Sequence, residues 1–236
     1  MIICGGDSFS KFNTPMGNGE QQHGYSAVEL LMDKFNTTGT CVGWSGASID
    51  ATVAKAIHYI NNHDNIKLLF FYLTANVRIM YSPKITDDYD YANNEYNDPG
   101  FFDDQVVTNV HSNDGKGITP EAYKYFQHQP TYKKYYDRYA YINFLTNVCK
   151  NRGIDVLYVY TTDNKLDSNL LLESSPGYNN VDHVRFIDID IPPGMYREVD
   201  FIKRRVGNHL FPHEQKEFYE KIMNAHESFI SRSLKK

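Results

Sequence analysis

The sequence predicts an α/β fold, a three-layer α/β/α sandwich around a mainly parallel sheet. Short apolar runs bounded by turn residues alternate with longer segments in which apolar residues recur at helical spacing. This alternation is typical of strand–helix–strand units around a parallel sheet. No internal repeat is visible, and 236 residues are ordinary for one such layer structure. We therefore expect a single domain over residues 1–236.

The candidate strands and helices alternate over most of the chain. Five apolar segments are predicted strands: Met1 to Cys4, Thr40 to Trp44, Ile66 to Leu73, Val156 to Tyr160 and Arg185 to Ile189. Four segments of helical period are predicted helices: Ser26 to Phe35, Ile49 to Ile60, Tyr136 to Cys149 and Glu214 to Ile230. At the first helix, Ser26 is followed three residues later by Glu29, which is the pattern of a capping box.

The segment 83–130 breaks this rhythm. It is rich in Asp, Asn, Tyr and Gly, and it has no sustained helical or strand period. We interpret it as a long insertion after the third strand. Ligand sites in open parallel sheets lie outside the carboxyl ends of the strands, where a connection leaving the third strand begins. The insertion is therefore expected to cover or line the active site.

Composition argues against two classes of partner. The net charge is −5, the sequence pI is about 6.0, and no run of five or six like charges occurs. Neither nucleic acid nor an anionic membrane surface is therefore an expected partner. The densest apolar stretch, Ile66 to Leu73, is far shorter than the roughly 20 residues that a membrane span needs. We expect a soluble protein, and its oligomeric state stays open.

The first residues and the cysteines indicate a cytoplasmic protein. Met1 to Cys4 runs straight into Gly5, without the basic and apolar regions of a signal peptide. Three cysteines, Cys4, Cys41 and Cys149, lie in apolar stretches. Their odd number and their surroundings are typical of buried, reduced thiols rather than of a disulfide framework. If the gene is viral, the host cytoplasm or the virion is the corresponding location.

The strongest chemical signal is Gly5-Gly6-Asp7-Ser8, directly after the first strand. A serine hydroxyl is a poor nucleophile at neutral pH, so it must be exposed, held rigidly and paired with a base. Glycines just before it let the backbone turn sharply and approach a substrate closely. The alternative reading is that Asp7 or Ser8 caps the next helix, and the position at a strand end favours a nucleophile.

Together with three later segments, this motif resembles the SGNH (GDSL-like) hydrolase family, whose four blocks contribute a serine, a glycine, an asparagine and a histidine. The matching segments are Gly6-Asp7-Ser8, Trp44 to Ile49, Leu73 to Asn76 and Gly207 to Leu210. They span nearly the whole chain, and their order carries the resemblance. Thr74 and Arg78 are also similar to a T-x-x-x-R pattern of phage-type members, in which Arg78 would bind substrate or pair with the acidic insertion.

The resemblance implies Ser8 as the nucleophile and an oxyanion hole made by the backbone N–H groups of Ser8 and Gly46 and the side-chain amide of Asn76. Such preorganised donors stabilise the negative oxygen of an acyl-transfer intermediate. A tight turn at Gly46 and an Asx turn at Asn76 are the structural alternatives.

His209 is the implied base, because it precedes the last amphipathic helix, where the family places its histidine. An imidazole near its ordinary pKa can take the serine proton and return it to the leaving group. His213 is the nearest rival for this role. A metal site made by these two histidines is a further alternative, but no third ligand is evident in the sequence. No metal and no cofactor are therefore expected.

The sequence departs from the family pattern beside His209. Relatives carry an Asp three residues before the histidine to orient the ring, and here that position is Val206. A backbone carbonyl, Asn208 or Asp200 would have to hold the imidazole instead. Loss of the orienting carboxylate lowers the rate of a serine hydrolase without abolishing catalysis.

We therefore expect a serine esterase or deacetylase that hydrolyses an ester through an acyl-enzyme on Ser8. The Tyr, Asn and Asp residues of the insertion favour a glycan, with O-acetyl groups as the substrate, because aromatic faces and carboxamides suit sugar rings. Two alternatives are an acyltransferase using the same acyl-enzyme and a catalytically inactive carbohydrate-binding relative. A small-molecule or glycan ester is the expected partner.

Overall fold

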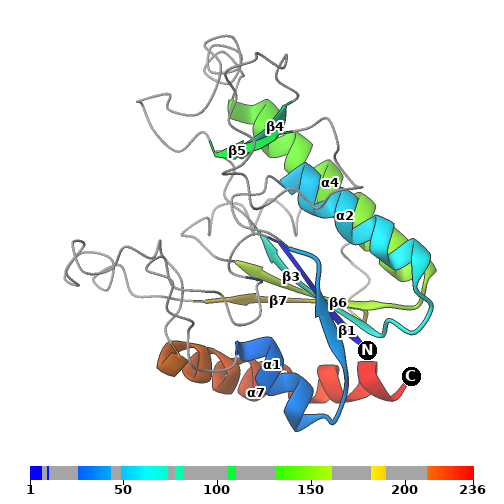
Figure 1. Ribbon diagram of the computed structural model, residues 1–236, viewed down its shortest axis with the longest axis vertical. Helices are drawn as coiled ribbons and strands as arrows, with labels where there is room; N and C mark the ends of the chain where they lie inside the picture. Colours follow the sequence, from blue (N-terminus) through cyan, green and yellow to red (C-terminus); the bar gives the residue numbers. More distant parts are fainter. Residues whose placement is uncertain are drawn as a thin grey trace, which may run out of the picture.

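The computed structural model shows a central sheet with helices on both faces (Figure 1). It describes residues 1–6, 10, 26–43, 49–73, 78–81, 106–109, 131–160, 182–189 and 212–236. Five strands form the main sheet: β1 (Ile2–Gly5), β2 (Gly39–Cys41), β3 (Leu68–Leu73), β6 (Asp155–Tyr160) and β7 (Val184–Asp188). Four helices are described: α1 (Ala27–Lys34), α2 (Ile49–Asn62), α4 (Thr131–Asn151) and α7 (Pro212–Lys235).

All four pairings in this sheet are parallel, in the order β2-β1-β3-β6-β7. The α/β fold class predicted from the sequence is confirmed. From β1 the chain continues to β2, which lies on one side of β1, and then to β3, which lies on the other side. The direction of winding therefore reverses between β1 and β3. Crevices at such a reversal, outside the carboxyl ends of the strands, are where open α/β sheets bind ligands. Gly6 and Leu73, at the ends of β1 and β3, flank this position.

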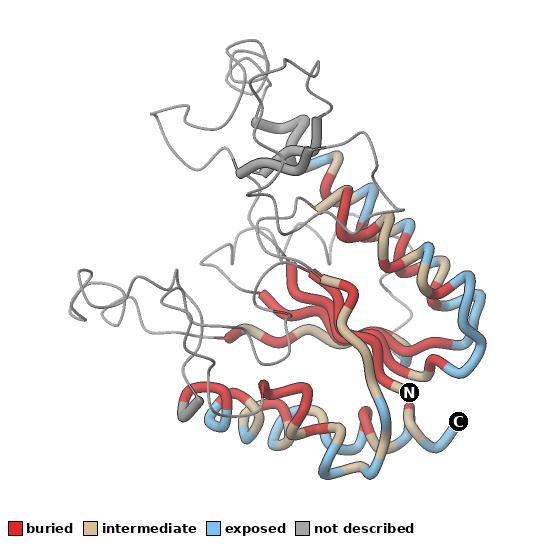
Figure 2. The backbone as a smooth tube through the Cα atoms, viewed as in Figure 1, coloured by how far each residue is buried: buried red, intermediate tan, exposed pale blue. Residues whose placement is uncertain are grey.

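Helices cover both faces of the sheet, which gives three layers (Figure 2). One face packs against α2 and α4 through Ile3, Leu69, Phe71, Val53, Ile60, Ile142 and Leu145. The other packs against α1 and α7 through Ile2, Leu68, Phe70, Leu31, Phe218, Ile222 and Ile230. Every residue of β3 is buried, because this strand lies in the middle of the sheet with helices on both sides.

The helix starts agree with the signals in the sequence. Ser26 Oγ accepts a hydrogen bond from the backbone N of Glu29, whose carboxylate accepts one from the backbone N of Ser26 at 2.7 Å. The predicted capping box at α1 is thereby confirmed. α7 begins at Pro212, two residues earlier than predicted, at a position where proline is favoured because its missing N–H would have no helical partner.

A two-stranded ribbon lies in and beside the predicted insertion, and the sequence did not predict it. β4 (Arg78–Tyr81) pairs antiparallel with β5 (Val106–Asn109), with Arg78 opposite Asn109. β5 lies inside the segment 83–130, for which no strand was predicted. A strand of four residues is too short to show a period, although the β-branched residues Val106, Val107 and Thr108 favour one. The remainder of 83–130 lies outside the described residues.

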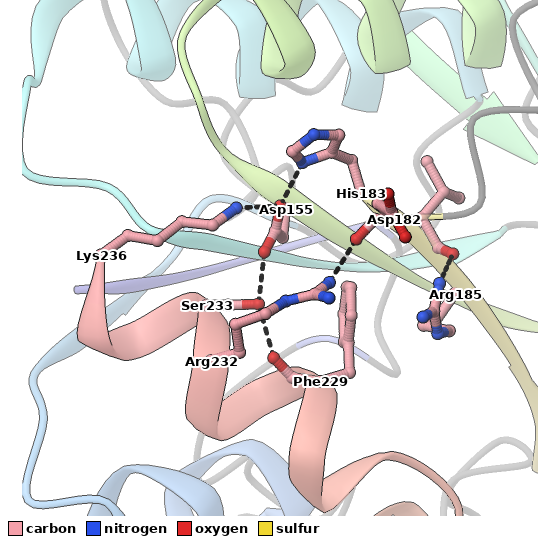
Figure 3. A network of polar contacts seen from close by, with 9 residues as sticks. Asp155, Asp182, His183, Arg185, Phe229, Arg232, Ser233 and Lys236 are labelled. Carbon is pink, nitrogen blue, oxygen red and sulfur yellow. Dashed lines mark hydrogen bonds and ion pairs between the residues drawn. The ribbon is translucent and has the colours of Figure 1, made fainter.

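The amino edge of the sheet is closed by a buried carboxylate (Figure 3). Asp155, the first residue of β6, is fully buried and accepts hydrogen bonds from His183 Nδ1 at 2.7 Å, Ser233 Oγ at 2.6 Å and Lys236 Nζ at 2.6 Å. Arg232 donates to the backbone carbonyl of Asp182 beside it. These contacts anchor the last turn of α7 to the start of β6 and β7. None of the helices that the structure describes is both long and apolar enough to cross a membrane.

Candidate functional site

Ser8, Gly46, Asn76 and His209, the four residues predicted to carry the chemistry, lie outside the residues that the structure describes. The same holds for Val206, Asn208 and Asp200 and for the side chains of Arg78 and His213. Each of the four predicted residues nevertheless stands within three residues of a described position. Three residues of chain reach at most about 10 Å. The described ends of β1, β2 and β3 and the start of α7 therefore define the neighbourhood of the candidate site.

The end of β1 requires glycine for two independent reasons. Gly6 has a φ of 122°, a backbone conformation that L side chains rarely adopt. A Cβ built on Gly6 would also lie 2.8 Å from the Cβ of Tyr72, and closer still to the carbonyl oxygen of Tyr72. The chain two residues before Ser8 therefore turns directly against the end of β3. Leu73 follows Tyr72, and Asn76 lies three residues beyond Leu73.

The chain after β2 runs against the same turn. A Cβ built on Gly43 would lie 3.1 Å from the carbonyl carbon of Gly6 and would overlap the hydroxyl of Ser10. Ser10 is itself buried, and Val42 N donates to the carbonyl oxygen of Cys4 at 2.8 Å. Gly46 follows Gly43 by three residues. The segments that lead to Ser8, Gly46 and Asn76 thus leave from three touching pieces of backbone.

α7 begins at the same edge of the sheet, three residues after His209 in the sequence. Its last turn contacts Asp155 at the amino edge, and Lys221 Nζ donates to the carbonyl of Asp188, the last residue of β7, at 2.6 Å. The helix therefore runs opposite to the strands and begins beyond their carboxyl ends (Figure 1). Gln215 Oε1 accepts a hydrogen bond from the backbone N of Ala27 at 2.9 Å, which joins the first turns of α7 and α1.

Arg138 is a buried charge at this edge that the sequence analysis missed. It is 2% exposed and lies one turn before Ile142 on the stripe of α4 that faces the sheet. Tyr158 Oη donates to the carbonyl of Ile142 at 3.3 Å, and Tyr160 lies two residues further along β6. An arginine in an otherwise apolar helical stripe, Arg138-Ile142-Leu145-Cys149, was the signal that could have revealed it.

Within the described parts of the chain, no three His, Cys, Asp or Glu side chains gather closely enough to hold a metal ion. The two-histidine alternative at His209 and His213 is not tested by this, because neither side chain is among those described. The expectation that the protein needs no metal and no cofactor stays a prediction.

Comparisons with families of known proteins and with curated proteins find no match for this chain. The resemblance to SGNH hydrolases therefore rests on the four short segments of the sequence alone. The candidate site has three geometric features. The winding of the sheet reverses between β1 and β3, and three touching backbone segments precede Ser8, Gly46 and Asn76. The start of α7 follows the fourth candidate, His209.

Proposed function

We propose that the chain is a serine esterase of the SGNH type, with Ser8 as nucleophile and His209 as general base. One observation carries this proposal: Gly6, Gly43 and Tyr72 meet in a single backbone cluster at the reversal point of the sheet. Acyl transfer needs a nucleophile and its oxyanion donors to converge on one substrate carbonyl. Ser8, Gly46 and Asn76 each follow this cluster by only a few residues. They can therefore reach the same substrate carbonyl.

In the proposed reaction, Ser8 Oγ attacks the ester carbonyl while His209 accepts the hydroxyl proton. The N–H groups of Ser8 and Gly46 and the side-chain amide of Asn76 stabilise the oxyanion. His209 then protonates the departing alcohol, which leaves an acyl group on Ser8. A water molecule, deprotonated by His209, attacks this acyl group and restores the free serine. Removal of one oxyanion donor typically lowers kcat by roughly 10² to 10³.

The proposed substrate is an O-acetylated glycan. Support comes from the composition of 83–130, whose tyrosines and carboxamides suit sugar rings and hydroxyls. The β4–β5 ribbon adds a pair of strands to this part of the chain, and β4 begins five residues after Leu73, the end of β3. β4 contacts α2, so the base of the insertion lies beside the helical layer of α2 and α4.

The deciding experiment is labelling with a serine-reactive fluorophosphonate probe, followed by identification of the modified peptide. We expect modification of Ser8 in the wild-type chain and none in Ser8→Ala. The same variant should lose hydrolysis of a short-chain nitrophenyl ester while its Tm changes by no more than a few degrees, because a hydroxyl outside the core contributes little to stability. Labelling of another residue, or activity retained by Ser8→Ala, would refute the proposal. Labelling without any hydrolysis would favour an acyltransferase, and no labelling would favour a binding protein.

The histidines provide a matched pair for the base. His209→Ala should be inactive and His213→Ala active, because only the first holds the family position before α7. Without the carboxylate at Val206, the imidazolium is less stabilised, so kcat/KM should rise through a pKa at or below about 6.5. A loss of about 10⁴ in rate for Asp200→Asn, with the fold intact, would instead identify Asp200 as the orienting group.

A further inference from the structure

Two of the three cysteines lie side by side on β1 and β2. Cys4 in β1 and Cys41 in β2 are in register on neighbouring parallel strands. Paired residues on adjacent strands present their side chains to the same face, at a strand separation of about 4.8 Å. Neither cysteine is in a disulfide, and their strand separation falls inside the Cα separations of about 4.4 to 6.8 Å that disulfides span.

Both thiols donate a hydrogen bond to the same backbone carbonyl oxygen. Cys4 Sγ donates to the carbonyl oxygen of Ser10 at 3.2 Å, and Cys41 Sγ donates to that same oxygen at 3.1 Å. Ser10 Oγ also lies 3.8 Å from Cys41 Sγ. Ser10 is 1% exposed and follows Ser8 by two residues. The two thiols thus tie the chain just after the proposed nucleophile to the ends of β1 and β2.

The two sulfurs differ in their surroundings. Cys4 is fully buried, and burial, with the nearby Cys41 and Glu29, raises the pKa of its thiol well above the ordinary value. Cys41 is partly exposed, which corrects the prediction that all three cysteines are buried. An oxidant from solvent therefore reaches Cys41 first, and Cys4 waits beside it as a protonated thiol. A solvent-accessible thiol next to a second cysteine that can react with its sulfenic acid is the arrangement found in redox-sensing pairs.

We propose that Cys4 and Cys41 form a reversible dithiol–disulfide site, oxidised by a peroxide, that controls the position of the segment carrying Ser8. Cys41 attacks hydrogen peroxide and becomes a sulfenic acid, releasing one water. The Cys4 sulfur then displaces the hydroxyl of this sulfenic acid, which forms the S–S bond and releases a second water. Two thiols lose two electrons and two protons, and the peroxide is reduced to water. A dithiol reductant reverses the reaction.

Oxidation removes both S–H donors from the carbonyl of Ser10. Without these two hydrogen bonds, Ser10 is held less tightly to the ends of β1 and β2. We expect Ser10 to shift and the position of Ser8, two residues before it, to shift with it. The expected effect of oxidation on activity, a slower reaction of Ser8, rests on the proposed function. The formation of the disulfide does not rest on it.

The covalent step is tested on the full chain, treated with hydrogen peroxide and digested without reductant. We expect a disulfide-linked pair of peptides containing Cys4 and Cys41, which dithiothreitol separates. Cys41→Ser should form no linked peptide, and Cys149→Ala, which alters a buried thiol in the α4 layer, should behave as the wild type. Oxidation of Cys41 to sulfinic acid without linkage to Cys4 would overturn the proposal. If Cys4→Ala fails to fold, Cys41→Ser still decides the outcome.

The positional step is tested by the rate at which the fluorophosphonate probe modifies Ser8. Peroxide should slow this rate at least several-fold in the wild type, dithiothreitol should restore it, and Cys41→Ser should show no change on peroxide treatment. An unchanged rate in a fully disulfide-linked sample would overturn control of Ser8. If Ser8 reacts in neither state, the proposed function fails. The positional step is then tested by amide exchange of the peptide from Gly5 to Ser10. Exchange should accelerate on oxidation, and an unchanged exchange rate would overturn the positional step.

Discussion

The two edges of the central sheet are built from different residues. At the carboxyl edge, β1 ends at Gly5, Gly6 follows it, and the chain after β2 contributes Gly43. Each of these glycines packs too closely against neighbouring backbone or side chains for a Cβ. At the amino edge, charged and polar side chains converge on Asp155, and Arg152 donates to the carboxylate of Asp64 at 2.7 Å. One edge is shaped by backbone and the other by side-chain hydrogen bonds.

This difference separates stability from chemistry. A buried carboxylate with three hydrogen-bond donors ties α7 to β6 and β7, far along the strands from the proposed site. The glycines instead let the three strand ends approach one another closely. Substitutions at the amino edge should therefore lower the free energy of unfolding and spare activity. Substitutions at the carboxyl edge should impair both.

The largest effect is expected for Gly6→Ala. The new Cβ would collide with the backbone of Tyr72, and the φ of 122° would strain any L side chain. Overpacking and strain together should cost about 3 kcal/mol or more, and ester hydrolysis should be lost. Urea unfolding and the nitrophenyl ester assay measure both quantities. Wild-type values for the two would show that the turn before Ser8 is not constrained as the structure describes.

Asp155→Asn should have the next largest effect, at the other edge. Burial raises the pKa of Asp155, but hydrogen bonds from Lys236, Ser233 and His183 outweigh it and hold the pKa below its ordinary value. Removal of the charge should cost about 2 kcal/mol, reduced by the partial exposure of Lys236 and His183. Activity at neutral pH should be unchanged.

The acid dependence supplies a second readout for Asp155. A lowered folded-state pKa stabilises the protein above the unfolded-state value and loses this contribution as pH falls through the folded-state value. Urea midpoints measured from about pH 5 to pH 3 should therefore fall more steeply for the wild type than for Asp155→Asn. Asp64→Asn, which alters an exposed ion pair at the same edge, is the matched control and should follow the wild type. Parallel curves for all three proteins would contradict this role.

Gln215→Ala should have an intermediate effect, on both stability and activity. Its side chain accepts the buried N–H of Ala27, and loss of this acceptor should cost about 1 kcal/mol. Because Gln215 lies in the first turn of α7, after His209, kcat should fall several-fold if the proposed base depends on that turn. Gln215→Glu keeps an acceptor oxygen near two helix starts, where negative charge is favourable. It should therefore retain most of the stability and most of kcat. Equal losses in the two variants would mean that packing, not the hydrogen bond, is what matters.

The smallest effect is expected for Gly153→Ala, the counterpart of Gly6→Ala at the amino edge. Gly153 follows α4 with a φ of 69°, and a Cβ there would meet nothing within 4 Å. Only the left-handed conformation is penalised, so the cost should be about 1 kcal/mol, measured by urea unfolding, with full activity. A loss as large as that of Gly6→Ala would remove the contrast between the edges.

Much of the fold could be predicted because its signals are local. Uniformly apolar runs gave β3 and β6 to within two residues, and helical period gave α2. The ribbon of β4 and β5 was missed because a four-residue strand is defined by its partner, and the partner is distant in sequence. Arg138 was missed because its burial depends on the tertiary packing around α4, which the local sequence does not show.

By itself, the sequence determined the alternation of strands and helices, the capping box at Ser26 and the placement of Gly6 two residues before a candidate nucleophile. These follow from propensity and pattern within a few residues. Only the tertiary structure decided which strands are neighbours, and hence that Gly6 touches Gly43 and Tyr72, that Cys4 lies beside Cys41, and that α7 begins beside α1. Such contacts depend on strand order and helix direction, which the packing of both helical layers on one sheet sets and no local segment encodes.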